Sequence, residues 1–353
     1  MTVLSTTAFL LLCIILVVFG LSDLESQLTE GKETAPKKNV NKRATQRAAI
    51  ESWYSSLKPE EDINASFWHD KMKLQAQHAF HHYIGLFSDV MKSKGATVNF
   101  LLVGACDGTH DVTIKERFLP NSHWNAGFVE PMEINVNDLT KYLTTENVIS
   151  RSHIIKAAVN NECVNATIRV KFPKYEAVKG TDAVPHWLRR QIGGIVSATD
   201  KVRDPMWKVE DVRCMTGVDV INEWSKATKK ANPKKKQKEY KASQKKRVHI
   251  LKIDAEGFDF EVLASFFPKT YVNSDLPLMI NFEAKSMKDK YQLARELLLS
   301  RGYEVSVYGT DGFAMLKPQN VFNVKKDGGT AMTGDSKVHV LDAYEEATEK
   351  DQI

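Results

Sequence analysis

The chain has 353 residues, of which 42% are apolar, and this content suffices for a globular core and excludes general disorder. Four cysteines without a CxxC pair exclude a disulfide-rich scaffold and argue against a structural zinc site. The net charge of +5 is concentrated in residues 226–247, which hold eleven basic residues and one acid, so the rest of the chain is mildly acidic. This distribution is not typical of a nucleic-acid-binding surface, and no nucleic-acid partner is expected.

The N-terminal segment at 1–22 is apolar and carries no charged side chain, with an almost continuous apolar run from Ala8 to Phe19. This pattern predicts either a secretory signal peptide, for which Val18 and Gly20 suit the cleavage rule, or an uncleaved signal-anchor transmembrane helix. A buried core helix is disfavoured because a polar tract follows directly. The expected localisation is the secretory pathway, either as a single-pass membrane protein of the endoplasmic reticulum or Golgi with a lumenal catalytic domain, or as a secreted protein after cleavage.

Two further features agree with a lumenal chain. Asn64 and Asn165 each begin an N-x-S/T tripeptide that can accept a glycan in the secretory pathway. In an oxidising lumen Cys163 and Cys214 could pair, and we state this disulfide as a hypothesis.

The segment before the first strand divides into a polar part and an apolar part. Residues 23–65 are charge-mixed without a sustained apolar period, and we interpret them as a stem or linker. From 66 to 94, apolar residues recur at helical spacing and predict a helix or helix pair that packs on a sheet. His78 and His82 could share one helix face as metal ligands, but no HExxH pattern accompanies them, so we expect surface histidines and no metal site.

From residue 97 onward, strand and helix signals alternate. The predicted strands are 98–103, 124–129, 153–159, 248–253 and 278–282, followed by a hairpin of 303–308 and 312–316. The predicted helices between them include 134–142, 260–267 and 287–300. This order predicts an α/β, Rossmann-like fold with a mostly parallel seven-stranded sheet, helices on both faces and a closing antiparallel hairpin.

The expected domain spans residues 66–317 and includes a variable insert at 160–247, which is too long for a simple connection between two strands. The basic run at 226–247 is interpreted as a solvated, disordered loop, and contact with acidic lipid or a polyanion is the alternative. Residues 318–353 lose all periodicity and are predicted to form a flexible tail.

A glycine-bearing turn, GACDG at 104–108, follows the first predicted strand. Such a turn presents backbone N–H groups, and Gly104 and Gly108 allow a ligand to approach the backbone closely. The turn lacks the GxGxxG fingerprint of dinucleotide-binding proteins, which disfavours a nicotinamide cofactor. A methionine-bearing cofactor fits better, because it has no pyrophosphate and its ammonium group needs carboxylate or carbonyl acceptors.

Three acids are candidates for binding such a cofactor. Asp107 and Asp254 are placed to accept from the ammonium group. Glu130 ends the next strand, where an acid accepts both ribose hydroxyls in Rossmann-like folds.

Between about residues 97 and 317 the sequence resembles the FkbM-type S-adenosylmethionine-dependent methyltransferase family. The resemblance rests on GACDG at 104–108, FVEP at 128–131, AAV at 157–159 and, as the most specific piece, LKIDAEGFDFEVL at 251–263. It extends to HWLRRQIGG at 186–194, FEA at 282–284 and RGYEV at 301–305.

This resemblance implies a class I methyltransferase fold, S-adenosylmethionine as cofactor and transfer of a methyl group, usually to a hydroxyl. By the same resemblance, the methionine end of the cofactor would be lined by Gly104, Ala105, Asp107 and Gly108. Glu130 would hold the ribose, and Asp254 and Glu256 would close the site below the fourth strand.

Methyl transfer to a hydroxyl requires alignment of the reactants and removal of a proton, which a carboxylate with a raised pKa can accept. The candidate catalytic acids are Asp254, Glu256 and Glu283, all at the carboxyl ends of predicted strands. For Glu256 the alternative is stabilisation of a helix N-terminus, which is also the expected role of the neighbouring Asp259. For Glu283 the alternative is an ordinary surface acid.

The expected function is therefore O-methylation of a hydroxyl on a glycan or another small compound of the secretory pathway, by a chain held at the membrane through its N-terminal segment. Leu102 stands where the family commonly has an acid, and it favours a second hypothesis, a catalytically inactive binding module. Arg189 and Arg190 could clamp an acidic substrate, although such a pair is more often solvated. A nicotinamide-dependent dehydrogenase is a third hypothesis, disfavoured by the missing glycine.

Overall fold

The computed structural model describes part of the chain, namely residues 42–57, 76–163, 167–173, 194–195, 207–230, 247–268, 276–308, 310–318 and 320. The chain divides into two compact units, Met1–Asn41 and Lys42–Ile353, and all described residues belong to the second. Among them, no helix combines the length and apolar character needed to cross a membrane. The predicted apolar segment at 1–22, both glycosylation acceptors and nearly all of the predicted tail lie outside the described residues.

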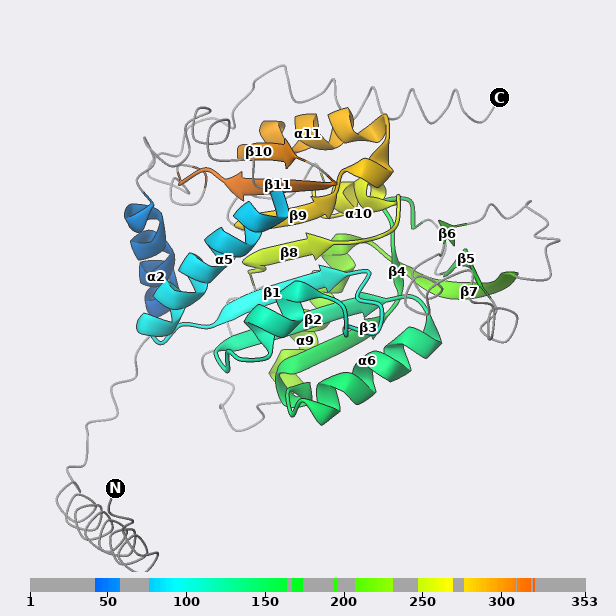
Figure 1. Ribbon diagram of the computed structural model, residues 1–353, viewed down its shortest axis with the longest axis horizontal. Helices are drawn as coiled ribbons and strands as arrows, with labels where there is room; N and C mark the ends of the chain where they lie inside the picture. The colour runs from blue at the N-terminus through cyan, green and yellow to red at the C-terminus, as the bar shows by residue number, and fades with distance from the viewer. Residues whose placement is uncertain are drawn as a thin grey trace, which may run out of the picture. The chain divides into compact units, whose positions relative to one another are not determined.

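The main sheet has seven strands in the order β10–β11–β9–β8–β1–β2–β3 (Figure 1). They are β1 (Val98–Val103), β2 (Trp124–Glu130), β3 (Ser152–Lys156), β8 (Ile250–Ile253), β9 (Met279–Glu283), β10 (Tyr303–Tyr308) and β11 (Asp311–Leu316). Strand β11 is antiparallel to both of its neighbours, whereas all other pairs in this sheet are parallel. The mostly parallel seven-stranded sheet with a closing antiparallel hairpin is thus confirmed, and its order reverses at β1, as it does in Rossmann-like folds.

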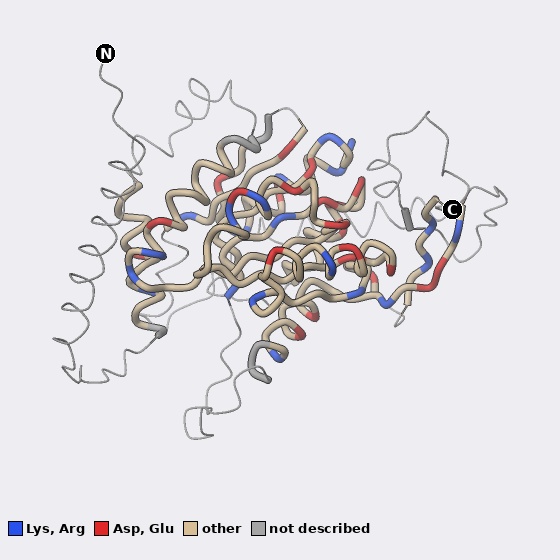
Figure 2. The backbone as a smooth tube through the Cα atoms, turned by 60° about the horizontal axis from the view of Figure 1, so that its bottom comes forward, with Lys and Arg blue, Asp and Glu red and all other residues tan. Residues whose placement is uncertain are grey.

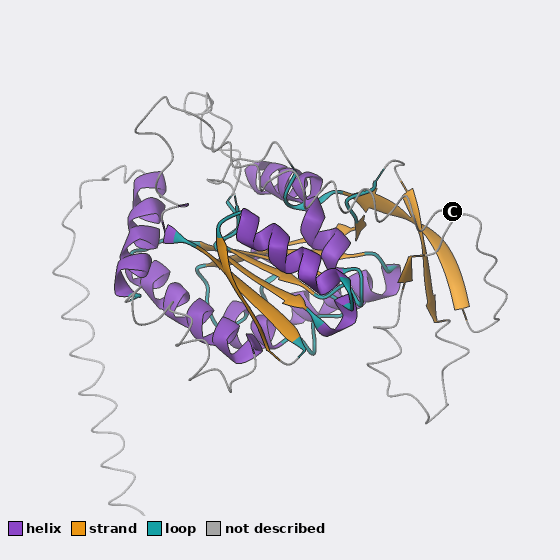
Figure 3. Cartoon of the chain, turned by 90° about the horizontal axis from the view of Figure 1, so that it is seen from above, coloured by secondary structure: helices purple, strands orange, loops and turns teal. Residues whose placement is uncertain are grey.

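Helices cover both faces of this sheet (Figure 3), as predicted. They are α2 (Lys42–Ser56), α5 (Ala76–Ser93), α6 (Glu133–Thr145), α9 (Gly217–Lys230), α10 (Asp259–Ser265) and α11 (Lys290–Ser300). Short helical turns lie at Ile114–Phe118, Ile149–Arg151 and Lys285–Met287. Because parallel strands need right-handed crossovers, the connections on the two sides of β1 place their helices on opposite faces.

Helix α2 corrects the predicted stem, because residues 42–57 belong to the folded domain. Trp53 and Tyr54 are 0% and 4% exposed, and the Trp53 ring contacts that of Phe87 on α5 at a centroid distance of 5.0 Å. The Tyr54 hydroxyl donates to the carbonyl of Leu316 at 2.6 Å. The apolar positions of α2 are confined to its second half, so a polar first half hides the helical period in the sequence.

The third predicted strand, 153–159, is in fact two strands that belong to different sheets. The chain leaves the main sheet after β3, and β4 (Ala158–Val159) pairs with β7 in a smaller sheet of order β4–β7–β5–β6. The other strands of this sheet are β5 (Thr167–Pro173), β6 (Gly194–Ile195) and β7 (Trp207–Met215). This sheet lies at the end of the main sheet where the parallel strands terminate (Figures 1 and 3). Strand β7 is missed by sequence reasoning because exposed charged residues interrupt its apolar positions.

The insert also contains α9, which begins at a cap formed by Thr216 and Asp219. The Thr216 hydroxyl accepts from the Asp219 amide at 3.2 Å and donates to the Asp219 carboxylate at 2.7 Å, a reciprocal helix cap. Because α9 continues to Lys230, the first five residues of the predicted basic loop are helical instead. Residues 231–246 lie outside the described part of the chain. Within the described part, basic and acidic residues are interspersed along the backbone (Figure 2).

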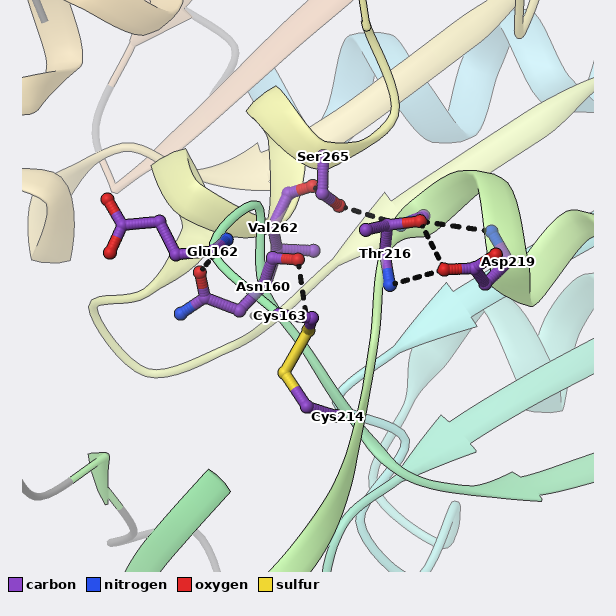
Figure 4. The surroundings of a disulfide bond; sticks show 9 residues. Asn160, Glu162, Cys163, Cys214, Thr216, Asp219, Val262 and Ser265 are labelled. Carbon is purple, nitrogen blue, oxygen red and sulfur yellow. Dashed lines mark hydrogen bonds between the residues drawn. A yellow bond between two sulfur atoms is a disulfide. The ribbon is translucent and has the colours of Figure 1, made fainter. Parts of the chain in front are cut away.

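A disulfide joins Cys163, after β4, to Cys214 on β7, which confirms the hypothesis of this pairing (Figure 4). The bond lies beside the junction of the two sheets, where the Asn160 amide donates to the Met215 carbonyl at 3.0 Å. The amide of Gly217, at the start of α9, donates to the Ser265 hydroxyl of α10 at 2.9 Å. The disulfide therefore joins the segment after β4 to the neighbouring strand β7 of the smaller sheet, and the Gly217–Ser265 hydrogen bond links the insert to α10.

We expect loss of this disulfide to destabilise the domain, because it closes a loop of 51 residues in the unfolded chain. The chain-entropy relation gives a loss of about 4 kcal/mol in the free energy of unfolding. Urea denaturation of Cys163→Ser/Cys214→Ser against the parent chain measures it. The double variant should not respond to reductant, and an unchanged denaturation midpoint on reducing the parent chain would contradict the expectation.

Candidate active site

The carboxyl ends of β1, β2 and β8 surround a cavity of about 280 Å³. The six predicted cofactor residues all line it, namely Gly104, Ala105, Asp107, Gly108, Glu130 and Asp254. Its apolar side includes Met132, Ala157 and Val159 after β2 and β3, together with Val170 of the smaller sheet. The ends of parallel strands thus bring a glycine-rich turn, buried acids and an apolar wall together, as expected where the strand order reverses.

The glycine-rich turn needs glycine because two chain segments nearly touch. Gly104 has φ +81°, and a Cβ atom at this position would lie 1.7 Å from the carbonyl oxygen of Asp254. The Asp254 amide donates to the Val103 carbonyl at 2.9 Å, so β8 and β1 stay paired to their last residues. The Gly104 and Ala105 amides both donate to the carbonyl oxygen of Val129 on β2, at 2.9 and 3.1 Å. The turn is therefore fixed to both neighbouring strands.

Glu130 is the most deeply buried acid of the cavity wall, at 4% exposure. One carboxylate oxygen accepts from the Cys106 amide at 2.9 Å, and the other accepts from the Met132 amide at 3.0 Å and from the Asn135 side chain at 3.2 Å. A carboxylate offers about four acceptor positions, so about one is left for a ligand. Burial raises the pKa of Glu130 to about 7, against the lowering effect of these donors.

Asp254 and Glu256, two of the predicted catalytic acids, also line the cavity. Both residues are exposed to solvent, and the nearby protein removes part of the hydration of their carboxylates. Burial raises the pKa of Asp254 to about 6, with Lys252 opposing and Glu283 assisting the shift. Burial, Asp254 and Glu283 together raise the pKa of Glu256 to about 7. Both acids are therefore poised to exchange a proton near neutral pH.

Glu283, the third predicted catalytic acid, lies at the end of β9 and is not among the cavity-lining residues in the described part of the chain. Its amide donates to the buried carboxylate of Asp259 at 3.1 Å. Its charge acts on the cavity indirectly, since it helps to raise the pKa of Asp254 and of Glu256.

Sequence reasoning missed an ion pair between Lys252 and Asp111 in the cavity wall. Both side chains are 10% exposed, and the second Asp111 oxygen accepts from the Ile114 amide at 2.7 Å. Burial acts to lower the pKa of Lys252, but Asp111 and the further acids Asp254 and Asp311 raise it overall. The available signal was a lysine inside an otherwise apolar strand, which requires an acid partner when buried.

Leu102 and the pair Arg189 and Arg190 also stand out in the sequence. Leu102 is 1% exposed within β1 and lies in the hydrophobic core, so it supplies no polar group to the cavity. Arg189 and Arg190 lie outside the described residues.

The sequence profile described as the methyltransferase FkbM domain matches residues 235–305, which confirms the family resemblance there. The match contains β8 with the acids that follow it, α10, β9 and α11. No curated protein shows significant similarity to the chain.

The chain shows a weak likeness to a number of solved structures, including two methyltransferases. The crystal structure of a methyltransferase FkbM from Methylobacillus flagellatus KT aligns with a TM-score of 0.35 and 14% identity, covering 62% of this chain and 43% of that chain. This chain thus spans less than half the length of that protein. An O-methyltransferase from Bacillus cereus, solved in complex with SAH, aligns with a TM-score of 0.33 and 11% identity, covering 81% of this chain and 94% of that one. The fold assignment rests on the strand order of the main sheet.

The close approach at Gly104 generates a stability prediction with a matched control. Gly104→Ala should lower the free energy of unfolding by more than about 3 kcal/mol, because its Cβ would overlap the Asp254 carbonyl. Gly95 also has a positive φ, +62°, but no atom lies within 4 Å of a Cβ there. Gly95→Ala should therefore lower the free energy of unfolding by only about 1–2 kcal/mol, which is the cost of the left-handed backbone conformation alone. Equal losses in urea denaturation would show that the approach of β1 to β8 is not as tight as described.

Proposed function

We propose that this chain, whose residues 235–305 match the FkbM methyltransferase family, is an S-adenosylmethionine-dependent methyltransferase that acts on a hydroxyl group. One observation carries the proposal. The family-matched segment supplies Asp254 and Glu256 to the same cavity into which the glycine-rich turn after β1 opens. A shared cavity is what a cofactor-dependent transfer requires, because donor and acceptor must meet in line.

The side chains around the cavity fit the parts of this cofactor. The acceptor position left on Glu130 suits a ribose hydroxyl, and the apolar wall with Met132 and Val159 suits a flat aromatic base. Asp107 and Asp254 offer carboxylates for an ammonium group. The absence of a cluster of basic residues among the described lining residues agrees with a ligand that has no phosphate.

Bound S-adenosylmethionine would supply a methyl group made electrophilic by its sulfonium. In such a transfer the methyl group would pass from sulfur to the acceptor oxygen, S-adenosylhomocysteine would be the leaving group, and the acceptor hydroxyl would have to lose its proton. Asp254 or Glu256 accepts this proton, since pKa values of about 6 and 7 leave a substantial ionised fraction at neutral pH. Lys252, fixed by Asp111, sits beside Asp254 and stabilises its ionised form.

Cofactor binding should depend on pH through Glu130. Ribose hydroxyls donate hydrogen bonds to the ionised form of Glu130. The pKa of Glu130 is raised to about 7, so at lower pH the side chain is mostly protonated and must lose its proton before the cofactor binds. We expect the affinity for S-adenosylhomocysteine to fall as the pH drops from 8 to 6, by at most about tenfold per unit. Glu130→Gln should bind more weakly at pH 8 and show a shallower pH dependence, as measured by isothermal titration calorimetry. No binding by the parent chain at any pH would refute the proposed function.

Methyl transfer from radiolabelled S-adenosylmethionine to a panel of neutral and acidic glycans tests the reaction itself. Asp254→Asn and Glu256→Gln should each lower kcat, by at least about 100-fold for whichever acid accepts the proton. Glu283→Gln is the matched control, because Glu283 does not line the cavity, and it should lower kcat far less. Binding of S-adenosylhomocysteine without transfer to any acceptor would favour the inactive binding module suggested by Leu102.

The proposed acceptor is a glycan or another compound of the secretory pathway. The disulfide supports an oxidising compartment, as do the predicted N-terminal apolar segment and the acceptors Asn64 and Asn165. Expression of the full chain in mammalian cells should give a product whose gel mobility shifts on removal of N-glycans, and Asn64→Gln/Asn165→Gln should abolish the shift. An unglycosylated product with free Cys163 and Cys214 would contradict this location.

A further inference from the structure

Glu256 holds an unfavourable backbone conformation at the edge of the cavity. Its φ of +51° lies in the left-handed region, and Gly257 follows with φ +95°. For a residue with a Cβ atom this conformation is uphill, so neighbouring groups must hold it in place. Specific contacts must therefore hold the backbone of Glu256 in this conformation.

The restraint comes from the carboxylate of Asp259, which is 0% exposed. One of its oxygens accepts from the amides of Ala255 and Gly257, the residues on either side of Glu256, at 3.3 Å each. The other oxygen accepts from the Glu283 amide at the end of β9, at 3.1 Å. A single buried side chain thereby joins the loop after β8 to the end of the next strand.

Asp259 lies in the first turn of α10, the position expected from the sequence for an acid that stabilises the helix dipole, but its hydrogen bonds go elsewhere. Asp259 is the first residue of α10, yet none of its three amide donors belongs to that helix. Helix capping would use amides two or three residues further along the helix. The carboxylate faces the loop and β9 instead, where it gives three partly buried amides a hydrogen-bond acceptor.

We propose that Asp259 is a positioning residue of the active site. Its carboxylate acts as a clamp: it binds the amides on either side of Glu256 and the amide of Glu283, and so holds the backbone of Glu256 in the left-handed conformation at the edge of the cavity. The role of Glu256 beside the acceptor rests on the proposed function, whereas the clamp itself does not. Catalysis needs the acid held in a fixed direction, and a loop of two left-handed residues would not hold it unaided.

The clamp is tested by comparing glycine with alanine at position 256. Neither carries a carboxylate, and glycine alone adopts the left-handed backbone without strain. In the full chain with Asp259 intact, the unfolding equilibrium constant of Glu256→Gly should be about fivefold smaller than that of Glu256→Ala. Asp259→Ala removes both acceptor oxygens, so in that background the loop can relax and this preference should vanish or reverse.

Asn147 provides the matched control, because it is also left-handed, at φ +56°, and sits in an exposed turn after α6. The preference for glycine over alanine at position 147 should be the same in the parent chain and in Asp259→Ala. A glycine preference at position 256 that Asp259→Ala leaves unchanged would overturn the proposal.

Two further measurements keep the result decisive. If Asp259→Ala does not fold, hydrogen exchange in the parent chain still tests the clamp. The Ala255 and Gly257 amides should be protected, and rapid exchange would overturn it. If the variant folds, its kcat for methyl transfer should fall at least tenfold while its affinity for S-adenosylhomocysteine changes less than twofold. Failure of the parent chain to bind S-adenosylhomocysteine would refute the proposed function and leave the stability comparison to decide the clamp.

Discussion

The contact between the ends of β1 and β8 is the constraint on which the site depends. Gly104 approaches the Asp254 carbonyl so closely that no side chain fits, while the Asp254 amide remains bonded to Val103. This contact brings the glycine-rich turn and the family-matched segment to the same cavity, although about 150 residues separate them in sequence. The strand order that produces it runs outward from β1 to both sides, with β2 and β3 on one side and β8 and β9 on the other.

The same close approach gathers acids that repel one another in a poorly solvated place. The pKa values of Glu130, Asp254, Glu256 and Asp259 are all raised, first by burial, so each carboxylate is less favourable in the fold than in the unfolded chain. Their ionisation therefore lowers stability as the pH rises from about 4 to about 7. Backbone amides at Glu130 and Asp259 and the ammonium of Lys252 limit this loss. Stability is traded here for groups that can bind a cationic ligand and exchange protons.

Elements with a strong local signal could be predicted from the sequence, and groups defined by tertiary contacts could not. The apolar strands β1, β2, β8 and β9 and the glycine-rich turn have local patterns, and the six cofactor candidates that these patterns indicate all line one cavity. Helix α2 and strand β7 were missed because their buried faces are short or interrupted by charges, and only their partners complete the core. The pairing of Lys252 with Asp111 spans 141 residues, and the donors of Asp259 come from two separate strand ends, so neither has a spacing signal.

The central claim is that the cavity at the ends of β1, β2 and β8 binds S-adenosylmethionine. A crystal structure of the chain grown with S-adenosylhomocysteine tests this most directly. The account predicts a ribose hydroxyl within hydrogen-bonding distance of Glu130, the base against Met132 and Val159, and the methionine end between Gly104 and Asp254. Ligand bound elsewhere, or a cavity left empty at saturating ligand, would contradict it.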